Sequence, residues 1–249
     1  MVKRIISVLV LTAAVFQVFG ADPKKSGKME SEDFLEQCRK QLLGYSWVKL
    51  KGNMNHRGKD GKRSRPVKIT CAAQLIPNKI TFKATLDGGQ SFKVEHSFGV
   101  KHDTKILENT LKEDNGFNKV GIKPTDLSLA FMYWDYIKEY EGESVGLLGT
   151  FKCRVFLLGN PDGKDFVKVW LSEQYLGPLQ VHWLKGIKQD DQDNPQQTLE
   201  FKDFAEKNKV WVPLESKITN VKGELQILFK GVDAAFSPTV PEDLYKTED

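Results

Sequence analysis

Apolar and polar residues alternate with a period of two along most of the chain after Tyr45. This period is typical of β-strands that bury one face and expose the other. Turn-forming residues such as Asp87-Gly88-Gly89 separate the alternating stretches and indicate hairpins between neighbouring strands. The expected strands cover residues 48–54, 67–75, 80–86, 92–98, 151–157, 167–171, 179–183, 199–204, 210–218 and 225–229. The chain should therefore contain about 10 or 11 antiparallel strands.

Two stretches have a helical period instead. Ser31 can cap a helix that ends before Gly44 and whose apolar positions are Phe34, Leu35, Cys38 and Leu42. A second, shorter helix is expected near residues 126–137, where one face carries Leu127, Phe131 and Trp134. This second helix is apolar enough to be either a plug in the core or a lid over a cavity, and the sequence leaves both open.

The order of these elements favours a mainly β fold. Strands do not alternate with helices as in βαβ units, and the sequence has no glycine-rich phosphate loop, so nucleotide-binding α/β folds are excluded. The remaining architecture is a curved antiparallel sheet with one apolar face, closed by two helical segments.

The N-terminus is typical of a secretory signal peptide. Lys3 and Arg4 precede an apolar run over residues 5–19, and the small residues Gly20 and Ala21 offer a cleavage site. We therefore expect the mature protein to be exported to the periplasm.

Cleavage at that site would divide the chain into three parts. Residues 1–20 are expected to be the signal peptide, residues 21–29 a flexible tail rich in lysine, and residues 30–249 a single domain that contains the curved sheet and both helical segments. A chain of 249 residues is short enough for one all-β domain to account for nearly all of it.

The charge balance argues against nucleic acid as a partner. The 37 lysines and arginines exceed the 33 aspartates and glutamates by only four, and Lys3 and Arg4 in the expected signal peptide account for two of these. Proteins that bind a phosphate backbone usually concentrate a strong basic excess on one face.

The three cysteines allow two interpretations. Cys71 and Cys153 are both in phase with the apolar positions of their strands, so they could face each other and form a disulfide in an oxidising compartment. Alternatively, both are buried free thiols, as is Cys38. No pair among the cysteines and the four histidines has the close spacing of a zinc site, so no metal is expected.

Catalytic motifs are absent from the sequence. It contains neither Gly-x-Ser-x-Gly nor His-Glu-x-x-His. We therefore expect that the protein is not an enzyme and binds no cofactor. His96 is in phase with the apolar positions of its strand, where it could bind a ligand head group or be a hydrogen-bonded core residue. Arg154 lies between Cys153 and Val155, and this alternation predicts that it points away from the apolar face.

One segment carries a resemblance to a known family. Residues 124–131, Pro-Thr-Asp-Leu-Ser-Leu-Ala-Phe, resemble the S-D-L/F segment of outer-membrane lipoprotein-sorting proteins, the LolA/LolB-like family. As in that family, this segment follows a first β-meander and precedes a strand of the Cys/Arg-Val-Leu type. In this chain that strand is Cys-Arg-Val-Phe-Leu-Leu at residues 153–158. The resemblance spans most of residues 30–238, and the later segments that keep the family's order are residues 167–171, 179–183, 198–204 and 210–213.

The resemblance implies an unclosed antiparallel β-barrel, capped by helices, around a hydrophobic cavity. It implies a periplasmic carrier, expected to be a monomer, that shields lipoprotein acyl chains or another lipid-like amphiphile in transit between membrane-bound donor and acceptor proteins. The alternative function is a non-catalytic scaffolding module whose sheet interior is a filled core. The candidate cavity and lid residues are Val48, Leu50, Ile69, Phe82, Phe92, Val94, His96, Leu127, Phe131, Trp134, Val169 and Val181.

Overall fold

The computed structural model describes residues 29–42, 45–98, 102–146 and 151–246. The expected signal peptide, all but the last residue of the expected tail, and Gly44 lie outside the described residues. From Ser31 onward the chain forms one compact unit.

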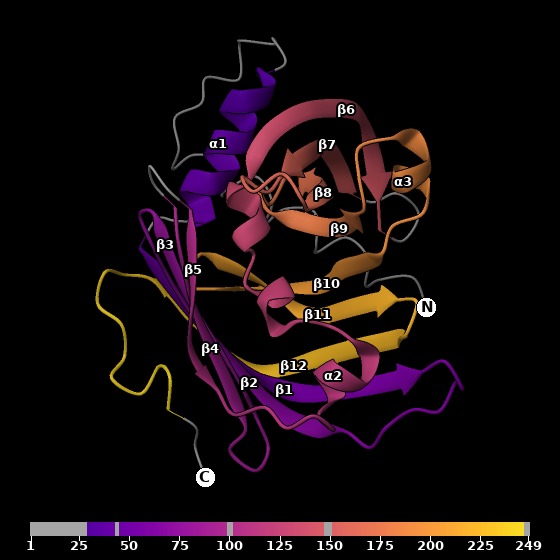
Figure 1. The fold of residues 1–249 in the computed structure, drawn as a ribbon. Helices are drawn as coiled ribbons and strands as arrows, with labels where there is room; N and C mark the ends of the chain where they lie inside the picture. Colours follow the sequence, from indigo (N-terminus) through magenta and orange to yellow (C-terminus); the bar gives the residue numbers. More distant parts are fainter. Residues whose placement is uncertain (1–28, 43–44, 99–101, 147–150, 247–249) are drawn as a thin grey trace, which may run out of the picture. The chain divides into compact units, whose positions relative to one another are not determined.

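In the described residues, 12 strands form one antiparallel sheet (Figure 1). The strands are β1 (Ser46–Gly58), β2 (Val67–Ile76), β3 (Lys79–Leu86), β4 (Ser91–Ser97), β5 (Asp103–Asn109), β6 (Asp135–Val145), β7 (Phe151–Gly159), β8 (Phe166–Ser172), β9 (Pro178–Leu184), β10 (Gln197–Lys207), β11 (Val210–Asn220) and β12 (Gly223–Phe236). Their order across the sheet is β5-β4-β3-β2-β1-β12-β11-β10-β9-β8-β7-β6. The sheet ends at β5 on one side and at β6 on the other, which confirms the expected unclosed half-barrel.

The helical elements are short except for the first. They are α1 (Ser31–Leu42), α2 (Gly116–Val120), η2 (Pro124–Leu127), η3 (Ala130–Tyr133) and α3 (Gln189–Asp193), of which η2 and η3 are 3₁₀ turns. The expected N-terminal helix is present as α1, and its residues Phe34, Leu35 and Cys38 are buried in the main core. The ring of Phe34 stacks on that of Phe156 in β7, with 6.0 Å between the ring centroids.

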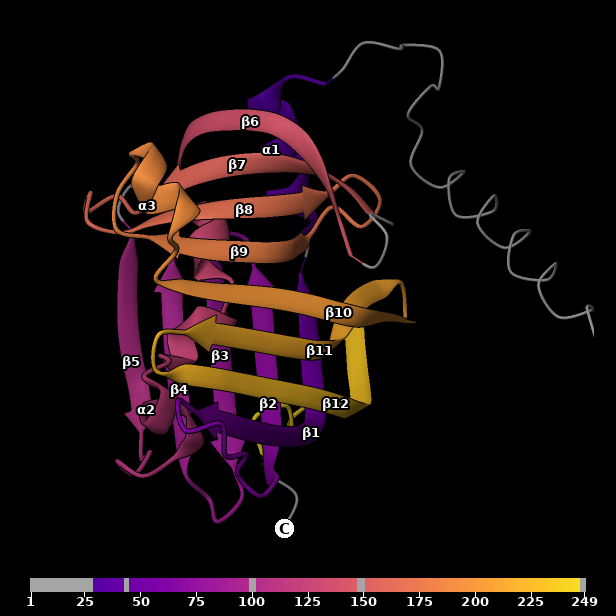
Figure 2. The ribbon, with the colours of Figure 1, turned by 90° about the vertical axis from the view of Figure 1, so that its right-hand side faces the viewer.

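The sheet changes direction near the middle of β1. Figure 2 shows β7 to β12 running across the direction of β2 to β5, so that the two halves of the sheet face each other. The register of β1 against β12 shifts between Lys51 and Gly52. A Cβ atom at Gly52 would lie 2.1 Å from the carbonyl oxygen of Leu228, so only glycine allows the strands to approach this closely.

The structure corrects the expected elements at three places. The alternation missed β5 and β6, and the helix expected near residues 126–137 consists instead of η2 and η3, after which β6 begins at Asp135. Both missed strands are edges whose side chains are mostly exposed on both faces, so they lack the alternation that marks a half-buried strand. The helix is interrupted at Leu129, which has a φ of 60°.

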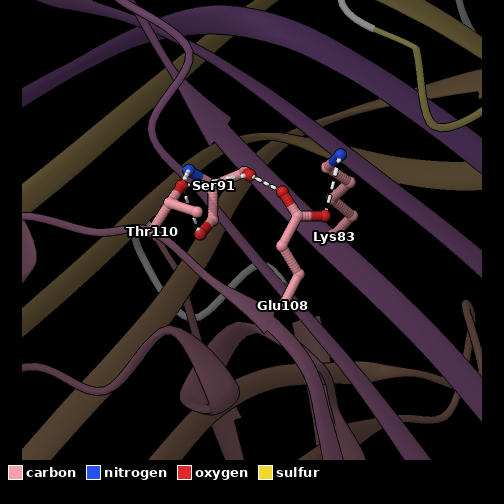
Figure 3. Close-up of polar contacts among 4 residues, drawn as sticks. All are labelled: Lys83, Ser91, Glu108 and Thr110. Atoms are coloured by element: carbon pink, nitrogen blue, oxygen red, sulfur yellow. Dashed lines mark hydrogen bonds and ion pairs between the residues drawn. The ribbon is translucent and has the colours of Figure 1, made fainter.

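Polar contacts hold the edge strand β5 (Figure 3). The Lys83 ammonium of β3 lies 3.3 Å from the Glu108 carboxylate, and the Ser91 hydroxyl donates a hydrogen bond to the same carboxylate. The Ser91 amide donates to Thr110 Oγ1 at 2.8 Å, and the Thr110 amide donates back to the Ser91 carbonyl at 2.8 Å. The Ser91 hydroxyl, aided by Lys83, holds the pKa of Glu108 below its usual value.

The bend in β1 leads to the first prediction. Gly52→Ala should lower the free energy of unfolding by about 1–3 kcal/mol, because the added methyl group forces the β1 and β12 backbones apart. The control is Gly177→Ala, since a Cβ there approaches no atom closer than 3.9 Å and should be tolerated. Urea unfolding of both variants measures the difference, and equal stabilities would contradict the role given to Gly52.

Candidate ligand-binding site

The two halves of the sheet enclose a cavity of about 190 Å³, which we call the apolar pocket. One wall comes from β1, β2 and β3, the other from β10, β11 and β12, and the chain around Leu127 and Leu176 contributes at the side. The apolar side chains in its lining include Val48, Leu50, Ala73, Leu75, Ile80, Phe82, Leu127, Leu129, Phe201, Phe204, Val212 and Phe229. None of the described residues that line it is charged.

Several core-facing residues of the apolar pocket are only half-buried. Val48, Ala73 and Leu127 belong to the inner apolar face, yet each keeps part of its surface uncovered because the cavity lies beside it. The pocket reaches the surface at Trp211 and Phe236, whose exposed fractions are 39% and 44%. This interior is therefore incompletely filled by its own side chains.

A second cavity of about 440 Å³, the mixed pocket, lies on the other side of residues 124–134. Leu127, Ser128 and Leu129 line the apolar pocket, whereas Phe131 and Trp134 line the mixed pocket. The segment from residue 124 to residue 134 thus separates the two cavities, and we call it the partition.

The partition is tied to β4 and β5 through His96. Its Nε2 lies 2.9 Å from Ser128 Oγ and its Nδ1 lies 3.0 Å from Thr104 Oγ1. Because the Ser128 hydroxyl donates to the Thr125 carbonyl at 2.6 Å, the imidazole donates from Nε2 and accepts at Nδ1. Burial lowers the pKa of His96 to about 4, so the ring is neutral at pH 7. Both ring nitrogens are engaged, as in a hydrogen-bonded core histidine.

Helix α1 holds the other end of the partition. Arg39 Nε donates to the Met132 carbonyl at 2.8 Å, and Arg39 Nη2 donates to the Trp134 carbonyl at 2.5 Å. The Tyr133 hydroxyl donates back to the Arg39 carbonyl at 3.3 Å. Residues 130–134 are therefore fixed to α1, while Leu127 and Leu129 face open space.

Arg154 points into the core face, contrary to the expectation from alternation. Its guanidinium binds the Glu139 carboxylate through Nε at 2.8 Å and Nη2 at 2.5 Å, which raises the pKa of Arg154. It also lies 4.6 Å from the centre of the Phe34 ring, and the Ser31 hydroxyl donates to Glu139 at 2.5 Å. The expectation was wrong because both faces of β7 are buried, so alternation does not distinguish them.

Comparison with solved structures identifies proteins of similar fold. No family model and no curated protein matches the chain. Among solved structures, a DUF1329 family protein from Desulfovibrio piger matches with a TM-score of 0.61 and 11% identity, over 86% of this chain and 95% of that chain. A putative outer membrane lipoprotein-sorting protein domain from Vibrio parahaemolyticus matches with a TM-score of 0.57 and 13% identity, over 86% and 95%. A LolA superfamily protein from Nitrosomonas europaea matches with a TM-score of 0.53 and 10% identity, over 88% and 99%.

The chain has a LolA-like fold. At these sequence identities the matches establish the fold alone, and they confirm the architecture to which the sequence resemblance pointed.

In the LolA-like fold the twelve candidate residues lie in three places. Val48, Leu50, Phe82 and Leu127 line the apolar pocket, and His96, Phe131 and Trp134 line the mixed pocket. The other five lie in the filled core and line neither cavity: Ile69, Phe92, Val94, Val169 and Val181. The candidate set omitted the walls from β10 to β12, although Phe201 and Phe229 lie in stretches where alternation predicted strands.

The structure does not bring Cys71 and Cys153 together. Both are buried free thiols, as is Cys38. Cys71 belongs to the main core inside the sheet, whereas Cys153 packs with Val155 and Trp170 in a separate cluster on the outer face. This placement does not support the disulfide that the strand phases allowed.

Two features of the described ranges bear on metal binding and membrane insertion. No group of three or more histidine, cysteine, aspartate or glutamate side chains in them is arranged to hold a metal ion. None of the helices formed by these residues is both long and apolar enough to cross a membrane.

Two histidines of the LolA-like domain, one buried and one half-buried, predict a pH dependence. Burial lowers the pKa of both His96 and His182 from 6.5 to about 4, and the Lys168 ammonium contributes at His182. The unfolded chain therefore binds protons below pH 6.5 that the folded chain does not bind. The stabilisation is fully present above pH 6.5 and should be lost as the pH falls towards 4.

Chemical unfolding at pH 7, 5.5 and 4.5 tests this dependence. The partly exposed His182 can be replaced without disturbing the partition, so His182→Gln should lose less stability over this range than the unmodified protein. Equal losses in the two proteins would contradict the assignment.

Proposed function

We propose that the protein is a non-catalytic carrier that holds the apolar part of an amphiphile, such as a lipoprotein acyl chain, in the apolar pocket. The observation that carries this proposal is that Val48, Ala73 and Leu127 lie on the core face but remain partly uncovered around a 190 Å³ cavity. A ligand that covered them would gain about 25 cal/mol for each Å² of apolar surface removed from water.

The chemistry of the lining favours an uncharged, flexible apolar group. Within the described lining the hydroxyl groups are those of Ser46, Ser128, Ser216 and Tyr175, and no lysine, arginine, histidine, aspartate or glutamate accompanies them. At the surface, the Tyr175 ring packs 5.3 Å from Phe204 and 5.0 Å from Trp211. Such an aromatic rim suits the boundary between a buried chain and an exposed head group.

The volume of the apolar pocket suggests that it opens further. Engineered apolar cavities of about 150 Å³ hold a molecule the size of benzene, and pockets for larger ligands are typically about 300–1,000 Å³. We infer that Leu127 and Leu129 move when a longer chain enters, while residues 130–134 remain held by Arg39. In this interpretation only the first half of the partition is a lid.

We further propose that residues 1–20 direct export, that the mature domain acts in the periplasm as a monomer, and that membrane-bound proteins load and unload it. The support is the basic and apolar N-terminal pattern together with a fold shared with a putative outer membrane lipoprotein-sorting protein domain. A scaffolding module is the alternative, and it requires that the apolar pocket never takes up a ligand.

Filling the apolar pocket should abolish ligand binding. We expect a fluorescent fatty-acyl probe to bind the purified domain with micromolar affinity, and Ala73→Phe to weaken binding by about tenfold or more because the ring occupies the cavity. Ala205→Phe is the matched control, because Ala205 does not line the pocket. Probe binding that survives in Ala73→Phe, or that appears only in partly denatured protein, would support the scaffolding alternative.

Hydrogen exchange should locate the lid. Residues 124–129 form a single 3₁₀ turn and its flank beside a cavity, so their amides should exchange faster than those of Val167–Leu171 in the buried strand β8. Adding the acyl ligand should change exchange in residues 124–129 and leave β8 unaltered. Slow exchange in both segments with no response to ligand would identify the partition as a plug.

A further inference from the structure

The mixed pocket has aromatic walls contributed by separate elements. Trp134 and Phe131 come from the partition, Trp183 comes from β9, and Phe98 directly follows β4. The Phe131 ring meets the Trp183 indole edge-on, with 5.6 Å between centroids, and Phe98 is supported by Tyr133 at 4.2 Å. Both tryptophans are half-buried, so part of each indole remains open to the cavity.

The same cavity has an acidic side. Its described lining contains the carboxylates of Asp103, Asp126, Asp162 and Asp165 but a single lysine, Lys123. His96 in the lining adds no compensating charge, because burial lowers its pKa to about 4. A cavity of this kind lowers the energy of a positive charge placed inside it.

Two of these carboxylates have oxygen atoms available to a ligand. Both hydrogen bonds to the largely buried Asp126 reach the same oxygen, Oδ2, one from Gln197 at 2.7 Å and one from the Lys123 amide at 3.3 Å. Its Oδ1 accepts no hydrogen bond from a described residue, and neither does the carboxylate of Asp165. Burial, with a smaller contribution from Asp165, raises the pKa of Asp126. A cation between the two groups would offset this repulsion.

The size of the cavity and the nature of its walls restrict the type of cation. The described carboxylates and histidines are not arranged to hold a metal ion, and 440 Å³ is far more space than a bare ion fills. A neutral sugar would match the aromatic walls but leave the excess negative charge uncompensated. An organic ammonium ion satisfies both, because indole faces attract cations and carboxylates neutralise them.

We propose that the mixed pocket is a binding site for a small organic ammonium ion, held between the indoles of Trp134 and Trp183 and the carboxylates of Asp126 and Asp165. This proposal is independent of the carrier function, because the mixed pocket and the apolar pocket lie on opposite sides of the partition.

Isothermal titration calorimetry of the full mature chain tests the proposal by comparing the affinities for choline and for its uncharged isostere 3,3-dimethylbutan-1-ol. Choline should bind about tenfold or more tightly than the isostere, since only choline gains the cation–π and carboxylate interactions. Asp165→Asn and Trp134→Leu should each weaken choline binding about fivefold or more. Asp190→Asn, at an exposed site in α3 outside the cavity, should leave it unchanged.

Different outcomes of the titration would contradict the proposal for different reasons. Equal affinity for choline and the isostere would mean that the pocket is merely apolar, and binding of glucose in place of choline would mean a sugar site. Either result, or no saturable choline binding by the unmodified protein, overturns the proposal. Asp165 is exposed and its side chain has no described hydrogen bond, so Asp165→Asn is expected to fold normally and to keep the test informative.

Discussion

The structure depends on the pairing of β1 with β12, which come first and last among the described strands in chain order and are neighbours in the middle of the sheet. All strands on one side of this pair come from the N-terminal half, and all strands on the other side come from the C-terminal half. The ladder extends from Ser46 opposite Phe236 to Gly58 opposite Gly223, and it joins residues that are far apart in the chain. Such long-range pairing carries a large loop-closure entropy, so it becomes favourable only when the apolar faces of both halves are buried together. The close approach at Gly52 allows the two faces to meet.

This topology also explains why the partition lies inside. Strands β5 and β6 follow one another in the chain but form opposite edges of the sheet. The connection between them must therefore pass from one half of the sheet to the other, and it carries Phe131, Met132 and Tyr133 into the main core. One segment thereby borders two cavities of different chemistry. Its anchors are polar, through His96 at one end and Arg39 at the other, whereas its contacts with the cavities are mainly apolar.

The sequence predicted the central strands well because each has at least one buried face. Alternate residues of such a strand face the core, and this produces the period of two. It failed at β5 and β6, whose side chains are mostly exposed, and at Arg154, where both faces of the strand are buried and the alternation is ambiguous. Inward phase made Val48, Phe82, Val94 and Val169 candidates for the cavity lining, but only Val48 and Phe82 line the apolar pocket, whereas Val94 and Val169 lie in the filled core. Which of these residues border a cavity depends on the separation between the two halves of the sheet, which local periodicity does not encode.

The burial of the three thiols has a chemical consequence. Burial raises the pKa of Cys38, Cys71 and Cys153 to about 12, so almost none of each is thiolate at neutral pH. Since thiolate is the reactive form in disulfide exchange, these thiols should react more slowly in the folded domain than in the extended chain. In an oxidising compartment, the order in which folding and oxidation occur would then decide whether the product is a native domain or a set of mispaired chains.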